Sequence, residues 1–424
     1  MIDIKQIREN PQGFKDAGRA KHFDVDIDYL LELDAELQQH KKQLQDMATE
    51  KNTLGKSIPE LTGEKKNYAI GHLSILKKNE AKLHDEVKKI QPTFDELMLQ
   101  VAQPADDDVP LGKDDTQNVE IRKEGQIRQF DFEPKDHVQL GRDLDIIDVE
   151  RGVKLAGTRN YLLKGDGAML HWAVLRFAMD YMVGKGYIPM SVPLLMKDEA
   201  MRGTGYYPGA EEQTYRMERD ELNLAGTAEV PLTAYRMGEI LKAEELPLKY
   251  VGLSSCFRRE AGAAGKDTYG LYRIHQFDKV EQVVICENDA EQSRRFHEEI
   301  LANAEAVMKA LELPYRVVNV CTGDLGRGQA KKFDIETWMP SRGGYCETHS
   351  ASKFYDFQAR RMNLRYKDPA TKKNIFCHTL NNTVVASPRI LIPLLELYQN
   401  ADGSVTIPQA LRPYMGGKEK ITRP

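Results

Sequence analysis

The chain has 424 residues, of which 41% are hydrophobic and 29% charged, so it can bury a real core and is not mainly disordered. It contains no run of about 18 apolar residues, which excludes a membrane-spanning helix, and we expect no signal peptide at its start. A net charge of −5 argues against a general nucleic-acid coat, and five cysteines without a CxxC pair favour a reducing, cytoplasmic setting.

Two long helices are the first predicted elements, within about residues 28–101. Apolar residues recur at alternating spacings of three and four from Leu30 to Ile58 and from Leu73 to Val101. Such heptads predict helices that pack along one seam. The polar exceptions on these two seams are His40, Lys51 and Glu80. Because Ser57, Pro59 and Gly63 interrupt the pattern, we expect an antiparallel coiled-coil hairpin, with helices of about 28 residues and a length of about 40 Å.

This hairpin is basic inside an acidic chain. Residues 41–90 contain eleven lysines and seven acidic residues, a net charge of +4. Charge alone does not distinguish a solvated coiled-coil surface from a surface that binds RNA phosphates.

The remainder of the chain has mixed character. Residues 103–115 are rich in proline and aspartate, and we interpret 106–115 as a linker. The pattern then predicts helices near 168–183, 289–311 and after Ser387, and strands near 249–258, 272–286 and 315–320. The predicted architecture is α+β, with an N-terminal region at 1–105 and one large domain at 116–424.

Two neighbouring segments carry the residues best suited to chemistry, CFRREAG at 256–262 and RIHQFDKVE at 273–281. If both are paired strands, their alternation allows Arg258, Phe277 and Glu281 to share one surface. An arginine fork suits a carboxylate or phosphate, an aromatic ring suits a base, and a glutamate can hold an amine. A hairpin with ordinary surface ion pairs at Arg258 and Glu260 explains the same pattern.

These segments closely resemble motif 2 of class II aminoacyl-tRNA synthetases, specifically of the seryl-tRNA synthetases. The resemblance covers nearly the whole chain and includes the helical arm, GYIPMSVPLL at 186–195 as motif 1, GTAEV at 226–230, DFQARR at 356–361 and SPR at 387–389 as motif 3. It implies a catalytic domain built on an antiparallel sheet flanked by helices, preceded by a tRNA-binding domain. The implied activity is formation of seryl-adenylate from L-serine and ATP, then transfer of serine to the 3′ end of tRNA(Ser) and of tRNA(Sec).

The resemblance also assigns residues to each ligand. Serine binding falls to Thr227, Ala228, Glu229, Arg258, Glu281 and Thr383. ATP binding falls to Arg258, Arg259, Glu260, Phe277, Glu347, Thr348, His349, Ser350 and Arg389, with Mg²⁺ linked to Glu347 and Ser350. The lysines expected to contact tRNA are Lys41, Lys42, Lys51, Lys56, Lys65, Lys66, Lys77 and Lys78.

Further expectations concern zinc, assembly and competing functions. No Cys/His group has zinc-ligand spacing, so we expect no zinc. Motif 1, with Pro193, implies a homodimer through the catalytic domain and no membrane partner. Ser387 is expected to cap a helix that begins at Pro388. A relative that loads a carrier protein would lack the arm, and an inactive RNA-binding paralogue would have lost the arginines or Glu281. This chain retains both the arm and those residues.

Overall fold

The computed structural model describes residues 1–263 and 267–423, and the chain divides into two compact units, Met1–Ala102 and Gln103–Pro424. Each unit is described by itself. Among the described residues, no helix combines the length and the apolar character that crossing a membrane requires.

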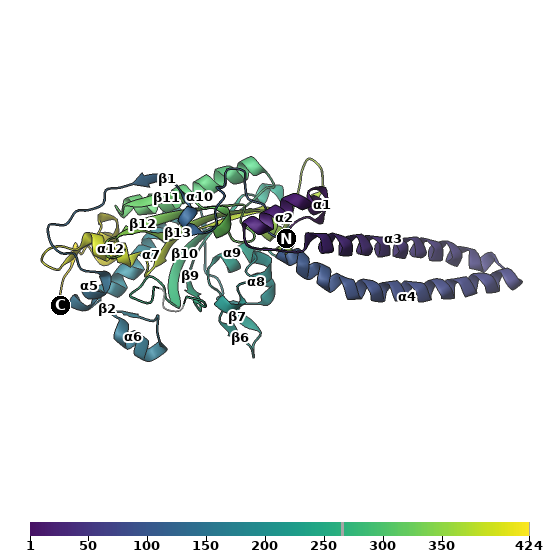
Figure 1. Ribbon diagram of the computed structural model, residues 1–424, viewed down its shortest axis with the longest axis horizontal. Helices are drawn as coiled ribbons and strands as arrows, with labels where there is room; N and C mark the ends of the chain where they lie inside the picture. The colour runs from purple at the N-terminus through teal and green to yellow at the C-terminus, as the bar shows by residue number, and fades with distance from the viewer. Residues whose placement is uncertain (264–266, 424) are drawn as a thin grey trace. The chain divides into compact units, whose positions relative to one another are not determined.

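The first unit is helical. Two short helices, α1 (Ile4–Glu9) and α2 (Pro11–Ala20), precede α3 (Ile27–Ser57) and α4 (Gly63–Gln100), which lie side by side as a long hairpin (Figure 1). With 31 and 38 residues, α3 and α4 are longer than predicted, about 46 and 57 Å at about 1.5 Å per residue.

The arm turns where the sequence predicted a break. The 3₁₀ turn η1 (Ile58–Glu60) follows α3, and Gly63 has a φ of +58°, a left-handed conformation that costs a glycine little. Every predicted seam position from Leu30 to Val101 is buried or half-buried. The heptad pattern therefore reports a packed interface rather than an isolated helix.

The second unit is built on an eight-stranded sheet. Its order is β1 (Val119–Glu124), β11 (Tyr315–Asn319), β12 (Lys331–Met339), β13 (Gly344–Tyr355), β16 (His378–Ser387), β10 (Gln276–Cys286), β9 (Leu248–Phe257) and β4 (Ile188–Met190). All neighbours are antiparallel except β4 and β9. The predicted α+β class with an antiparallel sheet and a helical arm is confirmed.

The larger helices cover one face of this sheet. Residues of α7 (Asp166–Gly184), α10 (Ala290–Ala310) and α12 (Leu391–Tyr398) share a continuous apolar core with the strands, and α10 runs along the sheet in Figure 1. On β10, Val280 and Val284 enter this core. Strand alternation therefore directs Lys279 and Glu281 to the opposite face, where the cavity described below opens.

Smaller elements complete the second unit. The short helices are α5 (His137–Asp143), α6 (Val149–Ala156), α8 (Asp198–Thr204), α9 (Glu229–Ala234) and α11 (Phe357–Met362). The short strands are β2 (Ile147–Asp148), β3 (Leu162–Leu163), β5 (Leu195–Met196), β6 (Arg216–Met217), β7 (Leu222–Leu224), β8 (Ile240–Lys242), β14 (Arg365–Lys367), β15 (Asn374–Phe376), β17 (Val405–Thr406) and β18 (Lys420–Ile421).

Two local predictions are wrong. Ser387 does not cap a helix, because it is the last residue of β16 and its hydroxyl lies 2.8 Å from Nδ1 of His171. The helix begins three residues after Pro388, at Leu391. Residues 272–275 are not strand either, since β10 begins at Gln276.

The segment interpreted as a linker is part of the second unit and is bonded to its other residues. The Asp106 N–H donates to the Ala330 carbonyl at 2.9 Å, and its carboxylate pairs with the buried Lys353 at 2.5 Å. Farther along, the N–H of Thr322 donates to the carbonyl of Pro110 at 2.9 Å. These bonds hold the segment on the ends of β12 and β13, so it is not a free tether.

Candidate active site

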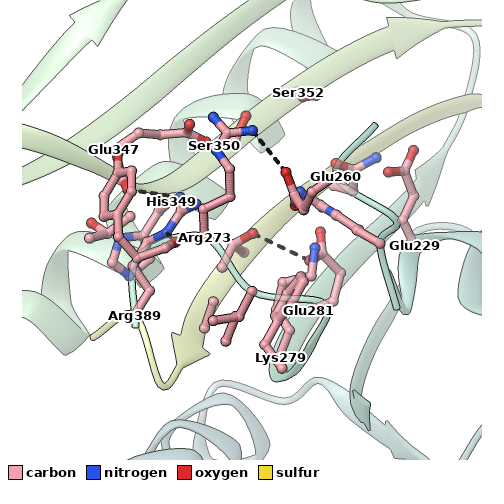
Figure 2. Close-up of a pocket in the computed structure, with 18 of the residues that line it drawn as sticks. Glu229, Glu260, Arg273, Lys279, Glu281, Glu347, His349, Ser350, Ser352 and Arg389 are labelled. Atoms are coloured by element: carbon pink, nitrogen blue, oxygen red, sulfur yellow. Dashed lines mark hydrogen bonds and ion pairs between the residues drawn. The ribbon is translucent and has the colours of Figure 1, made fainter. Parts of the chain in front are cut away.

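The hairpin of β9 and β10 brings the predicted chemical residues together. The two strands are antiparallel, with Phe257 opposite Gln276, so Arg258 follows directly on the end of β9. Phe277, Lys279 and Glu281 alternate along β10 and share a face. All four side chains line a cavity of about 220 Å³ (Figure 2).

The neighbouring strands supply most of the remaining wall. From β13 come Glu347, Thr348, His349 and Ser350; Thr383 comes from β16, and Arg389 from the turn before α12. Glu229 enters from the start of α9, and Glu260 from the segment after β9. The structure thus gathers eleven of the predicted serine and ATP residues around one cavity.

Three predicted site residues do not line the cavity. The Thr227 side chain is buried and accepts a hydrogen bond from the N–H of Glu229 at 3.1 Å, so it shapes the start of α9. Ala228 lies in an apolar cluster. Arg259 is exposed, and its backbone N–H donates to the Gln213 carbonyl at 2.9 Å.

One end of the cavity holds two buried carboxylates. Glu281 pairs with Lys279 at 2.5 Å (Figure 2) and lies 3.5 Å from the hydroxyl of Thr383. Glu229 accepts from the Tyr206 hydroxyl at 3.0 Å and from the Gln358 amide at 2.8 Å. Burial, followed by the nearby charge of Glu281, raises the pKa of Glu229 to about 7. Burial also raises the pKa of Glu281, although Lys279 opposes this shift.

The other end of the cavity is basic. The guanidinium of Arg258 lies 5.2 Å from the centre of the Phe277 ring, and Arg273 pairs with Glu260 at 2.8 Å. Arg389 donates to the carbonyl of Tyr272 at 3.1 Å and to that of Glu347 at 3.0 Å. These bonds use only part of each arginine fork, which leaves donors for an anion.

Glu347 and His349, on the same strand, both have lowered pKa values, which leave Glu347 ionised and His349 neutral near pH 7. Loss of solvent would raise the pKa of Glu347, but the positive charges of Arg389 and Lys332 outweigh it and hold the pKa below its ordinary value. Burial lowers the pKa of His349 to about 4, so its ring is neutral near pH 7. Its Nδ1 lies 2.8 Å from the Thr348 hydroxyl.

The chemistry around Ser350 suits a hard cation. Ser350 lies opposite Asp334 in the pairing of β12 with β13, three residues along the strand from the ionised Glu347. Carboxylate and hydroxyl oxygens are ligands that Mg²⁺ accepts, usually from one or two carboxylates together with substrate phosphates. Within 1–263 and 267–423, no cluster of three or more His, Cys, Asp or Glu side chains is arranged to hold a metal.

Sequence reasoning assigned no role to several lining residues, among them Lys279, Arg273, Tyr206 and Gln329. Lys279 could have been found, because it stands midway between Phe277 and Glu281 on an alternating strand. Tyr206 and Gln329 lie between the regular elements, and no local pattern marks them.

The arm contains the remaining predicted residues. Lys41, Lys42, Lys56, Lys65, Lys66, Lys77 and Lys78 are exposed. Lys51 differs from the other seven lysines expected to contact tRNA, because it lies half-buried on the seam and forms an ion pair with Glu80. A seam residue already paired in this way is not a mobile charge available for phosphates.

Comparisons with known proteins give a consistent result. Residues 1–103 match the family model described as seryl-tRNA synthetase N-terminal domain, and residues 213–398 match the class II tRNA synthetase core domain (G, H, P, S and T). A serine–tRNA ligase of Deinococcus radiodurans is 46% identical over 424 residues, with 100% of both chains covered.

Solved structures agree. A seryl-tRNA synthetase from Pyrococcus horikoshii complexed with ATP has a TM-score of 0.93 and 36% identity, with 100% of both chains covered. A cytoplasmic serine–tRNA ligase from Naegleria fowleri in complex with AMP has a TM-score of 0.88 and 31% identity, covering 100% of this chain and 99% of the other.

Proposed function

This chain belongs to the seryl-tRNA synthetase family, and we propose from that membership that it joins L-serine and ATP into seryl-adenylate and passes the seryl group to the 3′ end of tRNA(Ser). The observation that carries the proposal is a cavity with two buried carboxylates at one end and three arginines at the other. Such a cavity suits an amino acid whose ammonium and carboxylate point in opposite directions, with ATP beside the carboxylate.

The first step needs positioning more than a catalytic base. The serine carboxylate attacks the α-phosphorus, a new phosphorus–oxygen bond forms, and the bond to the departing pyrophosphate breaks. Arg258 is assigned to the carboxylate and the α-phosphate, and Arg389 to the γ-phosphate. Preorganised cations that meet developing phosphate charge account for most of the catalysis in such transfers.

Serine is distinguished from alanine by its hydroxyl. We assign the hydroxyl to Thr383 and Glu281, and the ammonium to Glu229, whose buried oxygens already accept two hydrogen bonds. A site built to bond a hydroxyl rejects the analogue that lacks it, because its own polar groups would be left unpaired. Thr227 and Ala228 would contribute through the backbone and the start of α9.

The ATP base and metal assignments rest on the same cavity. Phe277 is assigned to stack on adenine, with Glu260, Thr348 and His349 in the wall of the same cavity. The exposed Arg259, next to Arg258 in the chain, is assigned to ATP as well. Glu347 and Ser350 present oxygen ligands that fit Mg²⁺. When bound there, the ion would neutralise phosphate charge.

For tRNA, we propose one flank of the arm. Counted from Leu30 and Leu73 as position a, Lys41 and Lys77 take position e, which lies on the same flank of both helices in an antiparallel pair, and Lys42 and Lys78 follow at the outward-facing position f. The opposite flank has a shallow groove that includes Asp46, Glu50 and Glu86. Phosphates would avoid the acidic flank and favour the lysine flank. The same flank would serve tRNA(Sec).

We also propose a homodimer through the second unit. Three large apolar side chains of the second unit are exposed: Leu155 on α6 at 75%, Trp172 on α7 at 60%, and Ile188 at 53% on β4, the edge strand of the sheet that α7 also contacts. Large apolar groups left in water are typical of an interface with another chain. The family resemblance makes that chain a second copy.

A cytoplasmic location is proposed from the thiols. All five cysteines are free, and four of them are buried. Reduced thiols persist where glutathione and thioredoxin keep the compartment reducing.

The deciding experiment is ATP–pyrophosphate exchange with each of the twenty amino acids, followed by aminoacylation of tRNA(Ser). Exchange with serine alone, then serylation of tRNA, would support the proposal. Exchange with a different amino acid would refute the serine assignment, and an absence of exchange would leave an RNA-binding protein without activity.

A further inference from the structure

His137, the first residue of α5, is nearly fully buried outside the cavity, with 4% of its surface exposed. Its Nδ1 lies 2.7 Å from Oε1 of Glu396, and its backbone N–H donates to the same oxygen at 3.0 Å. Glu396 is completely buried on α12, the helix that follows Arg389, and α5 and α12 pack together in Figure 1. The chemistry proposed above uses neither residue.

The other ring nitrogen of His137 holds a backbone segment. Nε2 accepts a hydrogen bond from the N–H of Leu271 at 3.1 Å. An accepting Nε2 requires the neutral tautomer with its proton on Nδ1, which is the form that donates to Glu396. A Cβ on Gly270 would lie 2.0 Å from the same nitrogen, so the chain passes in direct contact with the ring. The imidazole therefore joins α12 to the residues leading into Tyr272.

The second oxygen of Glu396 reaches Tyr272 by another route. Oε2 accepts from the N–H of Ser341 at 2.9 Å, and the next residue, Arg342, has its guanidinium carbon 4.1 Å from the centre of the Tyr272 ring. The guanidinium carbon of Arg389 lies 4.4 Å from the same ring, and its Nε donates to the Tyr272 carbonyl at 3.1 Å. Both branches from Glu396 thus converge on the residue that orients Arg389.

We propose that His137 and Glu396 are positioning residues that set Arg389 for the phosphates of ATP. The inference rests on the proposed function for the assignment of ATP to this cavity. A guanidinium that meets a phosphate must be held to within a fraction of an ångström, and buried, fully bonded groups behind it provide that precision. The Glu396 carboxylate has three N–H donors, which makes it a fixed point for α5, α12 and the segment at Ser341.

Two substitutions separate the contacts of the two ring nitrogens of His137. In His137→Asn the shorter amide can still donate to Glu396 but cannot reach Leu271, whereas in His137→Gln the longer amide can still accept from Leu271. We expect His137→Asn to raise the KM for ATP in pyrophosphate exchange about tenfold, the effect of one lost buried hydrogen bond, with the KM for serine unchanged. His137→Gln should raise the KM for ATP by less than about threefold.

Hydrogen exchange at the Leu271 amide tests the contact without reference to activity. The amide should exchange faster in His137→Asn than in His137→Gln. As a control, His378→Asn changes another buried histidine, whose Nδ1 lies 2.7 Å from the Ser293 hydroxyl, and should lower the Tm while leaving the KM for ATP unchanged.

Equal effects of both His137 variants on the two KM values, with Leu271 exchange unaltered, would overturn the inference. Failure of the unmodified protein to catalyse exchange would instead refute the proposed function, and the Leu271 measurement would still decide whether the contact exists.

Discussion

Lys51 on α3 and Glu80 on α4 form an ion pair across the seam of the arm. They occupy heptad positions that are otherwise mostly apolar, and each side chain is about one-quarter exposed, at 25% and 24%. A single polar pair at such positions specifies the register of two helices, because a slipped register would place each charge against an apolar layer.

This pair predicts a pH-dependent contribution to stability. The hydrogen bond from Lys51 lowers the pKa of Glu80, so the pair stabilises the fold above the ordinary glutamate pKa of 4.5 and loses that effect as the pH falls through the lowered value. We expect Glu80→Gln to melt at a lower temperature than the unmodified protein at about pH 7, and the difference to disappear once the pH lies below the lowered pKa of Glu80. A constant difference across that range would contradict an ionic contribution.

Arg258→Ala should reduce serine-dependent pyrophosphate exchange by about 10²–10³-fold, because a preorganised cation at the α-phosphate is lost. The matched control is Arg216→Ala, which removes an exposed arginine that pairs with Asp198 away from the cavity. Near-normal exchange in Arg258→Ala, measured under saturating ATP and serine, would remove this arginine from the mechanism.

Replacing Lys41, Lys42, Lys77 and Lys78 together by alanine should weaken tRNA(Ser) binding without changing pyrophosphate exchange. A plot of the logarithm of the binding constant against the logarithm of the salt concentration has a negative slope. Each lost phosphate contact should make that slope less steep by about 0.7–0.9. The control is Lys82→Ala, which removes a lysine that lines the groove on the acidic flank. If the control and the fourfold variant weaken binding equally, tRNA does not distinguish the two flanks.

Serine binding should depend on the ionisation of Glu229. Since its pKa is raised to about 7 and an ammonium prefers the ionised carboxylate, the KM for serine should rise as the pH falls below about 7, while the KM for ATP stays level. Glu229→Gln should bind serine weakly with no such pH dependence. An unchanged pH profile in this variant would assign the titration to another group.

Trp172→Glu should convert the proposed dimer into monomers, measured by sedimentation velocity, because it places a charge on an exposed apolar position of α7, a helix that contacts the edge strand β4. The control, Ile121→Glu, adds the same charge on β1, at the opposite edge of the sheet. Dissociation by both substitutions, or by neither, would contradict an interface at this edge.

Much of this molecule could be predicted from local patterns. The heptads define the arm because a seam repeats over many turns, and the alternation on β10 places Phe277 and Glu281 on one face because a strand has period two. The family resemblance supplied the residues on β13 and β16, whose approach to β10 depends on pairing between distant segments.

Other features depend on tertiary contacts that no local pattern contains. Ser387 has the composition of a helix cap, yet its hydroxyl bonds to His171, 216 residues earlier in the chain, and the strand continues to that point. The segment at 106–115 has the composition of a loop but is held by the buried Lys353. Lys51 is among the lysines expected to contact tRNA although it stands on the seam, and its pairing with Glu80 depends on the other helix of the arm.

The two faces of β10 have a mechanical consequence. Val280 and Val284 are part of the apolar core, while Lys279 and Glu281, their neighbours on the same backbone, belong to the cavity. A close-packed core deforms little, so the cavity side of β10, with Lys279 and Glu281, is held rigidly in place. This coupling also carries a risk. A substitution that loosens the packing on the helix-covered side of the sheet would weaken the selectivity for the serine hydroxyl without changing any group that binds it.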